Sequence, residues 1–332
     1  MTRNPESCLI VGAGISGLLA ARELAKAGVE VTVLEESQSV GGRMSTRRSG
    51  EAVFDDGAQF FTARGERFGA LVSDWLQSRA AAEWSRGFPS PGQSAPDGHP
   101  RYRGAQGMSS IPRYLAAGLD VRTGERVERL QDEAGEWRVT TEAGGEISAA
   151  ALVLTPPAPR SLDLAQSGGF RLARDDRSAL AEISYDPCLA LMASLEGDES
   201  PAPDPGGLQI KSEPLDWISD NRLKSISAST ALTIHAGPGY SRDHYETPEE
   251  EVVPELLRLA EEALGASFAG RVTETSLRRW RYSWVTNPHP EPCLNAGSGP
   301  PLVFAGDGFG QPKVEGAALS SLAAADHLLA RD

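Results

Sequence analysis

The chain is poor in cysteine, in lysine and in long apolar runs. Its three cysteines, Cys8, Cys188 and Cys293, lie far apart and form no CxxC pair, which excludes a thioredoxin-like redox centre and gives no sign of a disulfide framework. No apolar run reaches the length that crosses a membrane, and the short polar start MTRNPES lacks the pattern of a signal peptide. These absences predict a cytoplasmic protein with free thiols and no membrane partner.

Positive charge is also scarce. The 332 residues include 32 Lys and Arg against 46 Asp and Glu, which gives a formal net charge of −14. That balance argues against a general affinity for nucleic acid or for an anionic membrane. An anionic ligand would need a local basic pocket. Arg278, Arg279 and Arg281 could line one, although solvated surface arginines are the more ordinary interpretation.

Several catalytic motifs are missing as well. The sequence has a single GxGxxG motif, so a second Rossmann site for a nicotinamide coenzyme is not expected. It has no GxSxG nucleophile elbow and no His, Cys and Asp cluster at metal-ligand spacing, so neither that nucleophile nor a metal centre is expected. A redox cofactor would therefore have to take electrons directly from a bound substrate.

The single GxGxxG motif lies in a full βαβ context. The run LIVGAGISG joins an apolar strand to a helix predicted over 15–26, and its three glycines are Gly12, Gly14 and Gly17. The first permits a tight turn, the second lets the backbone approach a pyrophosphate, and the third lets the helix pack on the strand. Glu35 ends a strand predicted over 29–36, where a carboxylate can accept both ribose hydroxyls and disfavours a 2′-phosphate. This context predicts dinucleotide binding.

Two more segments indicate that the dinucleotide is a flavin. GGRM places Arg43 beside Gly42, where a guanidinium can bind the pyrophosphate from the side opposite the helix. Near the end, PLVFAGDG puts Asp307 at the carboxyl end of a strand, where it can accept hydroxyls of a ribityl chain. The next helix, predicted to begin near Val314 or Glu315, directs its positive end to the same place, which favours a reduced flavin. Together the segments predict FAD and redox chemistry.

The rest of the chain predicts the architecture around this site. Strand and helix alternate at the start, and the apolar run 150–157 has the character of a buried parallel strand, so we expect an α/β, Rossmann-type FAD domain. The middle predicts a second, mostly antiparallel α+β substrate domain, with helical patterns over 68–84 and 249–264. The predicted domains are 1–70, 118–160 and 296–332 for FAD, and 71–117 and 161–295 for substrate.

These motifs resemble those of the renalase family, a branch of the amine-oxidase-like flavoproteins. Three segments carry the resemblance: DDGAQFFTA (55–63), LRRWRYSWVTN (277–287) and FAGDGFGQPKVEGA (304–317). The resemblance implies a p-hydroxybenzoate-hydroxylase-like fold with non-covalent FAD. It also implies oxidation of isomeric dihydropyridine nucleotides, with the hydride at ring position 2 or 6, to NAD(P)+. O2 then takes the electrons and becomes hydrogen peroxide.

The resemblance also assigns residues. It matches Ser16, Arg43, Gln59 and Phe60 to FAD contacts, and Trp280 to a wall of the substrate cavity. The full set of predicted FAD contacts is Gly12, Gly14, Ser16, Gly17, Glu35, Gly42, Arg43, Gln59, Phe60, Val127, Thr155, Asp307, Val314, Glu315 and Gly316.

The chain departs from amine oxidases proper in three respects. No cysteine follows the GDG segment to form a thioether with FAD, and Phe60 stands where the renalase family has a tyrosine. Lysine is confined to four positions: Lys26, Lys211, Lys224 and Lys313. None has the setting expected of a lysine that holds water beside the flavin, although Lys313 is near enough in sequence to stay open.

The implied chemistry asks little of the protein. The lone pair of the ring nitrogen expels the hydride, so no strong base is required and catalysis is positioning in a dry aromatic pocket. The predicted substrate contacts are Phe60, Trp280 and Tyr282 by stacking, and Asn221 and His235 through the carboxamide or ribose. His235 could instead be a satisfied core residue and Asn221 a turn residue.

Other functions on the same motifs stay open. A flavin amine oxidase or desaturase would use the same fold, a non-catalytic FAD-binding module would keep the cofactor site without turnover, and an NAD-dependent dehydrogenase would use the first glycine motif alone. The preferred isomer, the choice between NAD and NADP forms, and the oligomeric state are not set by the sequence.

Overall fold

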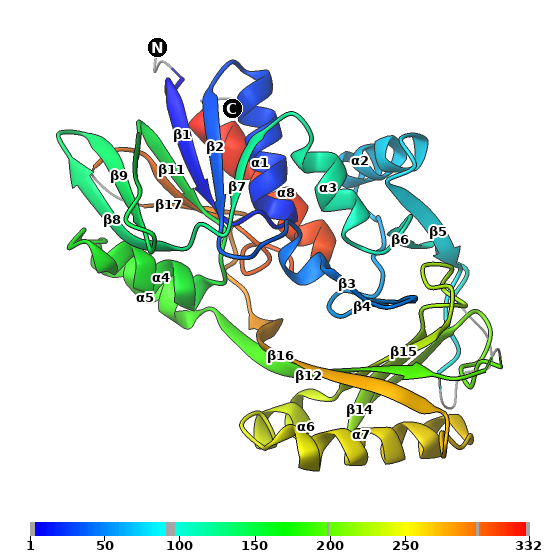
Figure 1. The fold of residues 1–332 in the computed structure, drawn as a ribbon. Coiled ribbons are helices and arrows are strands. Elements are labelled where there is room, and N and C mark those ends of the chain that lie inside the picture. The colour runs from blue at the N-terminus through cyan, green and yellow to red at the C-terminus, as the bar shows by residue number, and fades with distance from the viewer. Residues whose placement is uncertain (1–3, 91–96, 198, 297–298, 330–332) are drawn as a thin grey trace.

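The structure is a computed structural model that describes residues 4–90, 97–197, 199–296 and 299–329. Figure 1 shows two layers, an upper one built on a six-stranded sheet and a lower one built on a five-stranded sheet. Both ends of the chain lie at the upper layer, and the middle of the chain forms the lower one. The segments that carry the predicted cofactor motifs therefore come together although they are far apart in sequence.

The upper sheet is mostly parallel, as its apolar, β-branched strands predict. Its strands run in the order β17 (Leu294–Ala296), β18 (Leu302–Phe304), β11 (Ala151–Leu154), β1 (Ser7–Val11), β2 (Glu30–Glu35) and β7 (Asp120–Thr123). The strand predicted within 150–157 is confirmed, because β11 pairs parallel with both β1 and β18. This arrangement confirms the expected α/β, Rossmann-type class.

One face of the upper sheet is covered by helices. They are α1 (Ile15–Lys26), α2 (Glu66–Gln77), α3 (Ser110–Ala116) and α8 (Lys313–Leu328). Helix α1 has the predicted bounds, and Leu18, Leu19 and Leu24 are buried in the core beneath it. Side chains of the other helices, among them Phe68 and Ile111, enter the same core. This face thus depends on both ends of the chain.

The helix predicted over 68–84 is wrong in its second half. Helix α2 ends at Gln77, and Arg79 has a positive φ of 58° in the turn that follows. The next residues form β5 (Ala81–Ser85), which pairs antiparallel with β6 (Arg101–Gly104). Long-range strand pairing outweighs the local helical periodicity here, as tertiary context often does.

The opposite face of the upper sheet has a second cover. It consists of β8 (Val127–Glu133), β9 (Glu136–Thr141), β10 (Glu146–Ala149), α4 (Ala158–Ser167) and α5 (Arg174–Glu182). Trp137 and Leu180 share its core with Leu9 and Leu34 of the upper sheet. Helix α2 packs on α8, α3 on α1, α4 on β8 and α5 on α4, so all four belong to the covers of the upper sheet. Most of their residues fall in segments predicted as substrate domain. The predicted domain bounds stay a prediction.

The lower sheet is antiparallel and amphipathic. Its strands run in the order β13 (Gly207–Ser212), β14 (Leu215–Asp220), β15 (Thr230–Ala236), β12 (Ser184–Leu195) and β16 (Val272–Asn287). Alternate residues such as Leu189 and Leu191 pack on α7 (Glu249–Leu264), which has the predicted bounds, and α6 (Pro238–Asp243) lies beside it. The residues between them point to the other face, toward the upper layer.

A hairpin joins the two layers. It consists of β3 (Thr46–Ser49) and β4 (Ala52–Asp55), and it follows the short 3-10 turn η1 (Gly42–Met44). Ala52 and Phe54 of β4 pack on Met192 and Ala231 of the lower sheet. The hairpin therefore fixes the segment after Asp55 between the layers.

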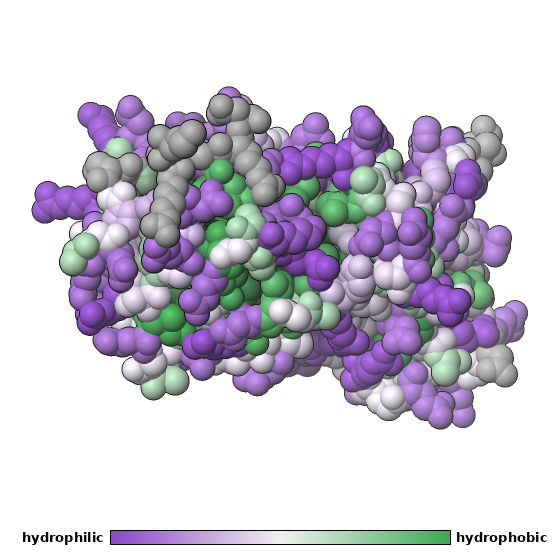
Figure 2. All heavy atoms as spheres, turned by 90° about the horizontal axis from the view of Figure 1, so that it is seen from above, coloured by the Kyte–Doolittle hydropathy of each residue, from purple (hydrophilic) through white to green (hydrophobic). Residues whose placement is uncertain are grey.

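The outer surface at the upper layer is mostly polar. Figure 2, seen from above, shows hydrophilic side chains over most of this face, with apolar side chains visible in hollows between them. Among the described residues, no helix has the length and apolar character needed to cross a membrane.

Candidate functional site

The amino end of α1 forms a phosphate cradle. Gly14 precedes the helix in an extended conformation, and no side chain caps the helix amino end. A Cβ atom at Gly14 would meet nothing within 4 Å, so the space above the turn is open. A Cβ at Gly17 would lie 1.9 Å from the carbonyl oxygen of Gly12, which itself has a φ of +98°. Free N–H groups beside open space suit a bound pyrophosphate.

The two ends of the chain meet at this cradle. The hydroxyl of Ser16 donates to the carbonyl of Ala317 at 2.9 Å, which ties the first turn of α1 to α8. Gly41, the first residue of GGRM, donates its N–H to the carbonyl of Ala13 at 2.9 Å. In α8, a Cβ at Gly316 would lie 1.5 Å from the carbonyl oxygen of Gln311, so only glycine fits there. The three predicted cofactor segments therefore form one continuous surface.

Arg43 and Asp307 form a bidentate ion pair across this surface. The two guanidinium N–H groups donate to the two carboxylate oxygens at 2.6 Å each. Burial alone would lower the pKa of Arg43, but the charge and hydrogen bonds of Asp307 raise it above its ordinary value. Arg43 also donates to the carbonyl of Tyr282 at 3.2 Å, which links the upper layer to β16. Both residues lie where the sequence predicts contacts with pyrophosphate and ribityl groups.

Two carboxylates of the predicted FAD contacts bind backbone. Glu35 is buried, and its oxygens accept from the N–H groups of Ala13 at 2.7 Å and Ser37 at 2.9 Å, so it lies directly beside the glycine turn. Glu315 accepts from the N–H of Gly65 at 2.7 Å, and thus caps the start of α2 with its side chain. Contact of the helix start at Glu315 with FAD stays a prediction.

Three other predicted contacts are Thr155, which follows β11, Val127 in β8 and Val314 in α8. The hydroxyl of Thr155 donates to the carbonyl of Val11 at 2.8 Å, and a Cβ at Gly12 would lie 2.6 Å from that hydroxyl oxygen. Val127 is buried at the start of β8, and Val314 packs on the core beside α8. Contact of these residues with FAD stays a prediction.

Residues 55–60, which we call the strap, connect the cofactor surface to the lower sheet. A Cβ at Gly57 would lie 2.2 Å from the carbonyl oxygen of Arg43, and the N–H of Ala58 donates to that oxygen at 2.8 Å. On the other side, the indole N–H of Trp280 donates to the carbonyl of Asp56 at 2.7 Å. The strap thus holds Arg43 and Trp280 in fixed positions relative to each other.

Gln59 of the strap lies beside His235. Its amide nitrogen donates to the carbonyl of Asp55 at 2.6 Å, and its amide oxygen accepts from the hydroxyl of Ser219 at 2.8 Å. The same nitrogen lies 3.5 Å from Nε2 of His235. Burial, with a smaller contribution from the charge of Lys224, lowers the pKa of His235 to about 4. His235 is therefore a neutral imidazole at physiological pH.

The strand register brings the predicted substrate residues to one face of the lower sheet. Ala190 of β12 pairs with His235 on one side and with Arg278 on the other, and Trp217 pairs with His235. Paired residues share a face, so this row and Trp280, two residues beyond Arg278, point toward the strap. Trp217 of β14 was not among the predicted substrate contacts.

The aromatic side chains fall into two groups. Phe60 packs on Phe88 and Trp217, with ring centroids 5.1 and 5.4 Å apart. Tyr282 packs edge-on against Tyr185 at 5.6 Å. Phe60 is part of the strap, Trp280 bonds to it, and the carbonyl of Tyr282 bonds to Arg43. The stacking of these three rings on a substrate stays a prediction.

The three arginines of β16 have different partners. Arg279 pairs with Glu249 at 3.1 Å and Arg281 pairs with Glu246 at 3.0 Å, so acids of the lower layer balance their charges. The guanidinium of Arg278 lies 4.5 Å from the ring centroid of Trp280. Only Arg278 of the three is thus directed toward the predicted substrate wall.

Asn221 is a buried structural residue. Its side chain is fully buried, and its amide nitrogen donates to the carbonyl of Ala231 and the hydroxyl of Thr233, both at 2.9 Å. Its amide oxygen accepts from the N–H of Asp55 at 3.4 Å. These bonds use its donors and acceptor inside the protein, which corrects the expectation that Asn221 binds substrate and supports its role in the turn.

No group of His, Cys, Asp and Glu that could hold a metal occurs among the described residues. The three cysteines are free thiols, and Cys8 and Cys188 are buried. The site therefore offers a cradle for phosphates, an ion pair, a neutral histidine and aromatic rings. Such a set can bind and orient a cofactor and a planar substrate.

Two family models match the chain. Residues 10–75 match the model of an NAD(P)-binding Rossmann-like domain, and residues 68–329 match that of the flavin containing amine oxidoreductases. Renalase from Mus musculus is 25% identical over 331 residues, which cover 95% of this chain and 96% of that protein. An L-amino-acid oxidase from Echis ocellatus is 60% identical over 48 residues, which cover 14% of this chain and 10% of that protein.

Solved structures share the fold over almost the whole chain. A putative protoporphyrinogen oxidase from Exiguobacterium sp. 255-15 has a TM-score of 0.77 at 13% identity, covering 98% of this chain and 99% of that one. A triple mutant of putrescine oxidase has a TM-score of 0.73 at 17% identity, with the same coverage. These likenesses show that the two-layer fold is shared with both structures.

Proposed function

Because the chain belongs to the family of flavin-containing amine oxidoreductases and is renalase-like along 95% of its length, we propose that it oxidises isomeric dihydropyridine nucleotides. The substrate would be a 2- or 6-dihydro form of NAD(P), which becomes aromatic NAD(P)+ when it loses a hydride. The net reaction consumes the dihydronucleotide, O2 and one proton, and it yields NAD(P)+ and hydrogen peroxide.

The cofactor of the proposal is non-covalent FAD. The residues fit it, because the space above Gly14 is open, the amino end of α1 has no side-chain cap, and Arg43 and Asp307 lie beside it. No cysteine follows Cys293 in the sequence, so the carboxyl-terminal segment has no thiol for a thioether. When bound, FAD supplies an acceptor for the hydride and passes the electrons on to O2.

The protein's own part in the reaction is positioning. Hydride loss is driven by aromatisation of the ring, so the site needs no group that removes a proton. Trp280, Tyr282 and Phe60 provide flat apolar surfaces that exclude water, and neutral His235 offers a hydrogen bond to a carboxamide or ribose hydroxyl without adding positive charge. A cationic histidine would oppose formation of the pyridinium cation, so its neutral state suits this product.

One observation carries the proposal: the three renalase-like segments meet at one place. Within 55–63 the strap accepts the indole N–H of Trp280 from 277–287, and Arg43 joins Tyr282 to Asp307 of 304–317. The segment 277–287 lies in β16 of the lower sheet, so the resemblance extends beyond the nucleotide-binding layer. This supports a likeness on the predicted substrate side as well.

The test is anaerobic mixing of the FAD-loaded protein with a mixture of 2- and 6-dihydro NAD, followed by flavin absorbance. We expect rapid bleaching, and slow bleaching with ordinary 4-dihydro NADH. Dithionite added to the same sample is the control that the flavin can be reduced. A flavin that dithionite bleaches and both dihydro isomers leave oxidised would contradict the proposal.

Amines are the second candidate substrates, since the description of the matching family names them. The same anaerobic experiment with primary and secondary amines separates the two functions. Reduction by an amine, with the dihydro isomers inert, would favour the amine oxidase.

A further inference from the structure

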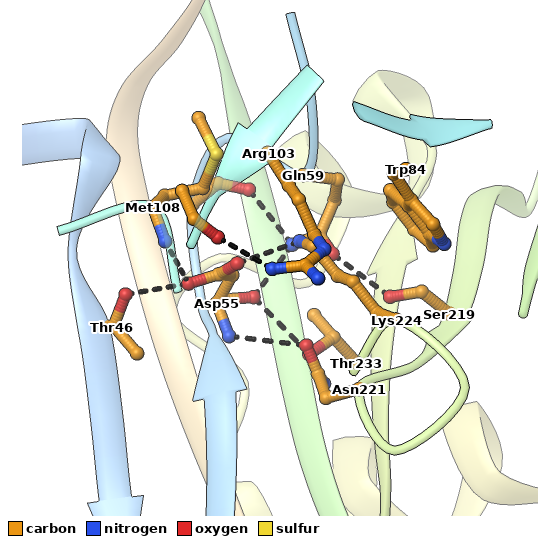
Figure 3. Close-up of polar contacts among 12 residues, drawn as sticks. Thr46, Asp55, Gln59, Trp84, Arg103, Met108, Ser219, Asn221, Lys224 and Thr233 are labelled. Atoms are coloured by element: carbon orange, nitrogen blue, oxygen red, sulfur yellow. Dashed lines mark hydrogen bonds and ion pairs between the residues drawn. The ribbon is translucent and has the colours of Figure 1, made fainter. Parts of the chain in front are cut away.

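A buried ion pair joins Asp55, the first residue of the strap, to Lys224. The predicted chemistry does not use this pair. Lys224, in the turn after β14, has its Nζ atom 2.6 Å from Oδ2 of Asp55, and both side chains are 0% exposed. Figure 3 shows Asp55 at the centre of these contacts, with Lys224 and Gln59 close to it. The ammonium also lies 4.8 Å from the ring centroid of Trp84. No other lysine has so enclosed a setting among those the structure describes.

Such a pair is a costly way to hold a fold together. Two charges that leave water lose hydration energy, and their mutual attraction offsets this loss only when the geometry is good and further hydrogen bonds satisfy both groups. Apolar residues of the same volume often stabilise a fold equally well. Asp55 has those further bonds. Its Oδ1 accepts from the hydroxyl of Thr46 at 2.6 Å and the N–H of Met108 at 2.7 Å. The carboxylate is thus held by Thr46 of β3, by Met108 just before α3 and by Lys224 in the turn after β14.

Hydrogen bonds connect Asp55 to Gln59 and, through Gln59, to His235. The backbone carbonyl of Asp55 accepts from Gln59 at 2.6 Å and from Thr233 at 3.2 Å. Gln59 then reaches Ser219 at 2.8 Å, and its amide nitrogen lies 3.5 Å from His235. The position of His235 at the substrate wall is therefore connected to the ion pair through one side chain.

The charge of Lys224 also acts on His235. Besides Lys224, the backbone of Asp56 bonds to this histidine and raises its pKa. Arg103 of β6 acts on Asp55 and Lys224, and Arg278 of β16 lies across the sheet from His235, with Ala190 of β12 between them. Burial is the main cause of the low pKa of His235, and the positive charge of Lys224 lowers it further. Arg103 donates to the carbonyls of Gly104 and Ala105.

We propose that Lys224 is a positioning residue, which fixes Gln59 and His235 at the substrate wall through Asp55 and whose positive charge opposes a second positive charge on His235. The proposal rests on the proposed function, in which His235 binds the substrate. Lys224 itself touches neither substrate nor cofactor in this scheme. Replacing Lys224 by an uncharged residue should change the titration of His235, and replacing it by another cation should leave that titration as in the wild type.

The test compares FAD-loaded wild-type protein with Lys224→Met and Lys224→Arg by NMR titration of labelled histidine. In Lys224→Met, we expect the titration midpoint of His235 to rise by about one pH unit, since one positive neighbour is removed. The acid limb of kcat/KM for the dihydronucleotide should move up by the same amount. Lys224→Arg should titrate as the wild type does. Lys26→Met, at an exposed lysine of α1, is the matched control and should change nothing.

Loss of one partner of a buried pair can prevent folding, so a second variant is needed. Lys224→Gln keeps a hydrogen-bond donor for Asp55 while it removes the positive charge, and it should also raise the His235 midpoint. A wild-type midpoint in either folded variant would overturn the proposal. The titration needs no substrate, so it can succeed although the dihydronucleotides prove inert, and it can fail although they reduce the flavin.

Discussion

Acid should destabilise the folded protein through His235. In the folded state burial, reinforced by Lys224, lowers the pKa of His235 to about 4, whereas the unfolded chain has the ordinary value of about 6.5. The unfolded chain therefore binds a proton that the folded chain refuses, and stability falls as the pH falls from about 6.5 to about 4. The pKa difference of roughly 2.5 pH units corresponds to about 3 kcal/mol in the free energy of unfolding. The protein keeps all of this stability above about pH 6.5.

The measurement is the free energy of unfolding in denaturant at several pH values, for FAD-saturated wild type and His235→Asn. The variant lacks the titrating group, so it should lose about 3 kcal/mol less than the wild type across this window. Its absolute stability at neutral pH will differ, so only the change with pH is compared. His99→Asn, at an exposed histidine, should follow the wild type. Equal losses in wild type and His235→Asn would refute the reasoning.

Three further predictions concern the strap, its partner Trp280 and the ion pair of Arg43 with Asp307. Gly57→Ala places a Cβ 2.2 Å from the carbonyl oxygen of Arg43, so the strap must shift by about 1 Å and the rate of flavin reduction should fall about 100-fold; a rate within about twofold of wild type would contradict this. Asp307→Asn removes the charge that holds Arg43, and FAD should bind about tenfold more weakly by fluorescence titration; an unchanged Kd would argue against a cofactor role. Trp280→Phe loses the bond to Asp56, which should cost about 1 kcal/mol in the free energy of unfolding and raise KM; wild-type values of both would leave Trp280 without a role.

Local sequence patterns predicted the helices and strands around the glycine turn well. The bounds of α1 and α7 follow from periodicity and from glycines that end the helices, and the glycine turn follows from spacing alone. Such features depend on residues close together in the chain. The same holds for β11, whose apolar run marks a strand buried on both faces.

The other half depends on which distant residues meet. Lys224 looks like an ordinary turn lysine until the fold buries it against Asp55, and Asn221 looks like a candidate ligand until its amide is seen to be fully used. The end of α2 was missed because β5 pairs with a strand across a loop. In each case a contact at long sequence separation decides the outcome. The predicted FAD contacts and domain bounds stay predictions.

The hydrogen bond between Ser16 and Ala317 has a consequence for how the protein is made. Its partners are 301 residues apart, so a growing chain carries half of a nucleotide site until the last helix leaves the ribosome. At about 5–20 residues per second, that interval is roughly 15–60 s. During it the glycine turn has no second wall, and the cofactor cannot be enclosed. In the proposed function, flavin binding would therefore follow the synthesis of α8, which supplies that second wall.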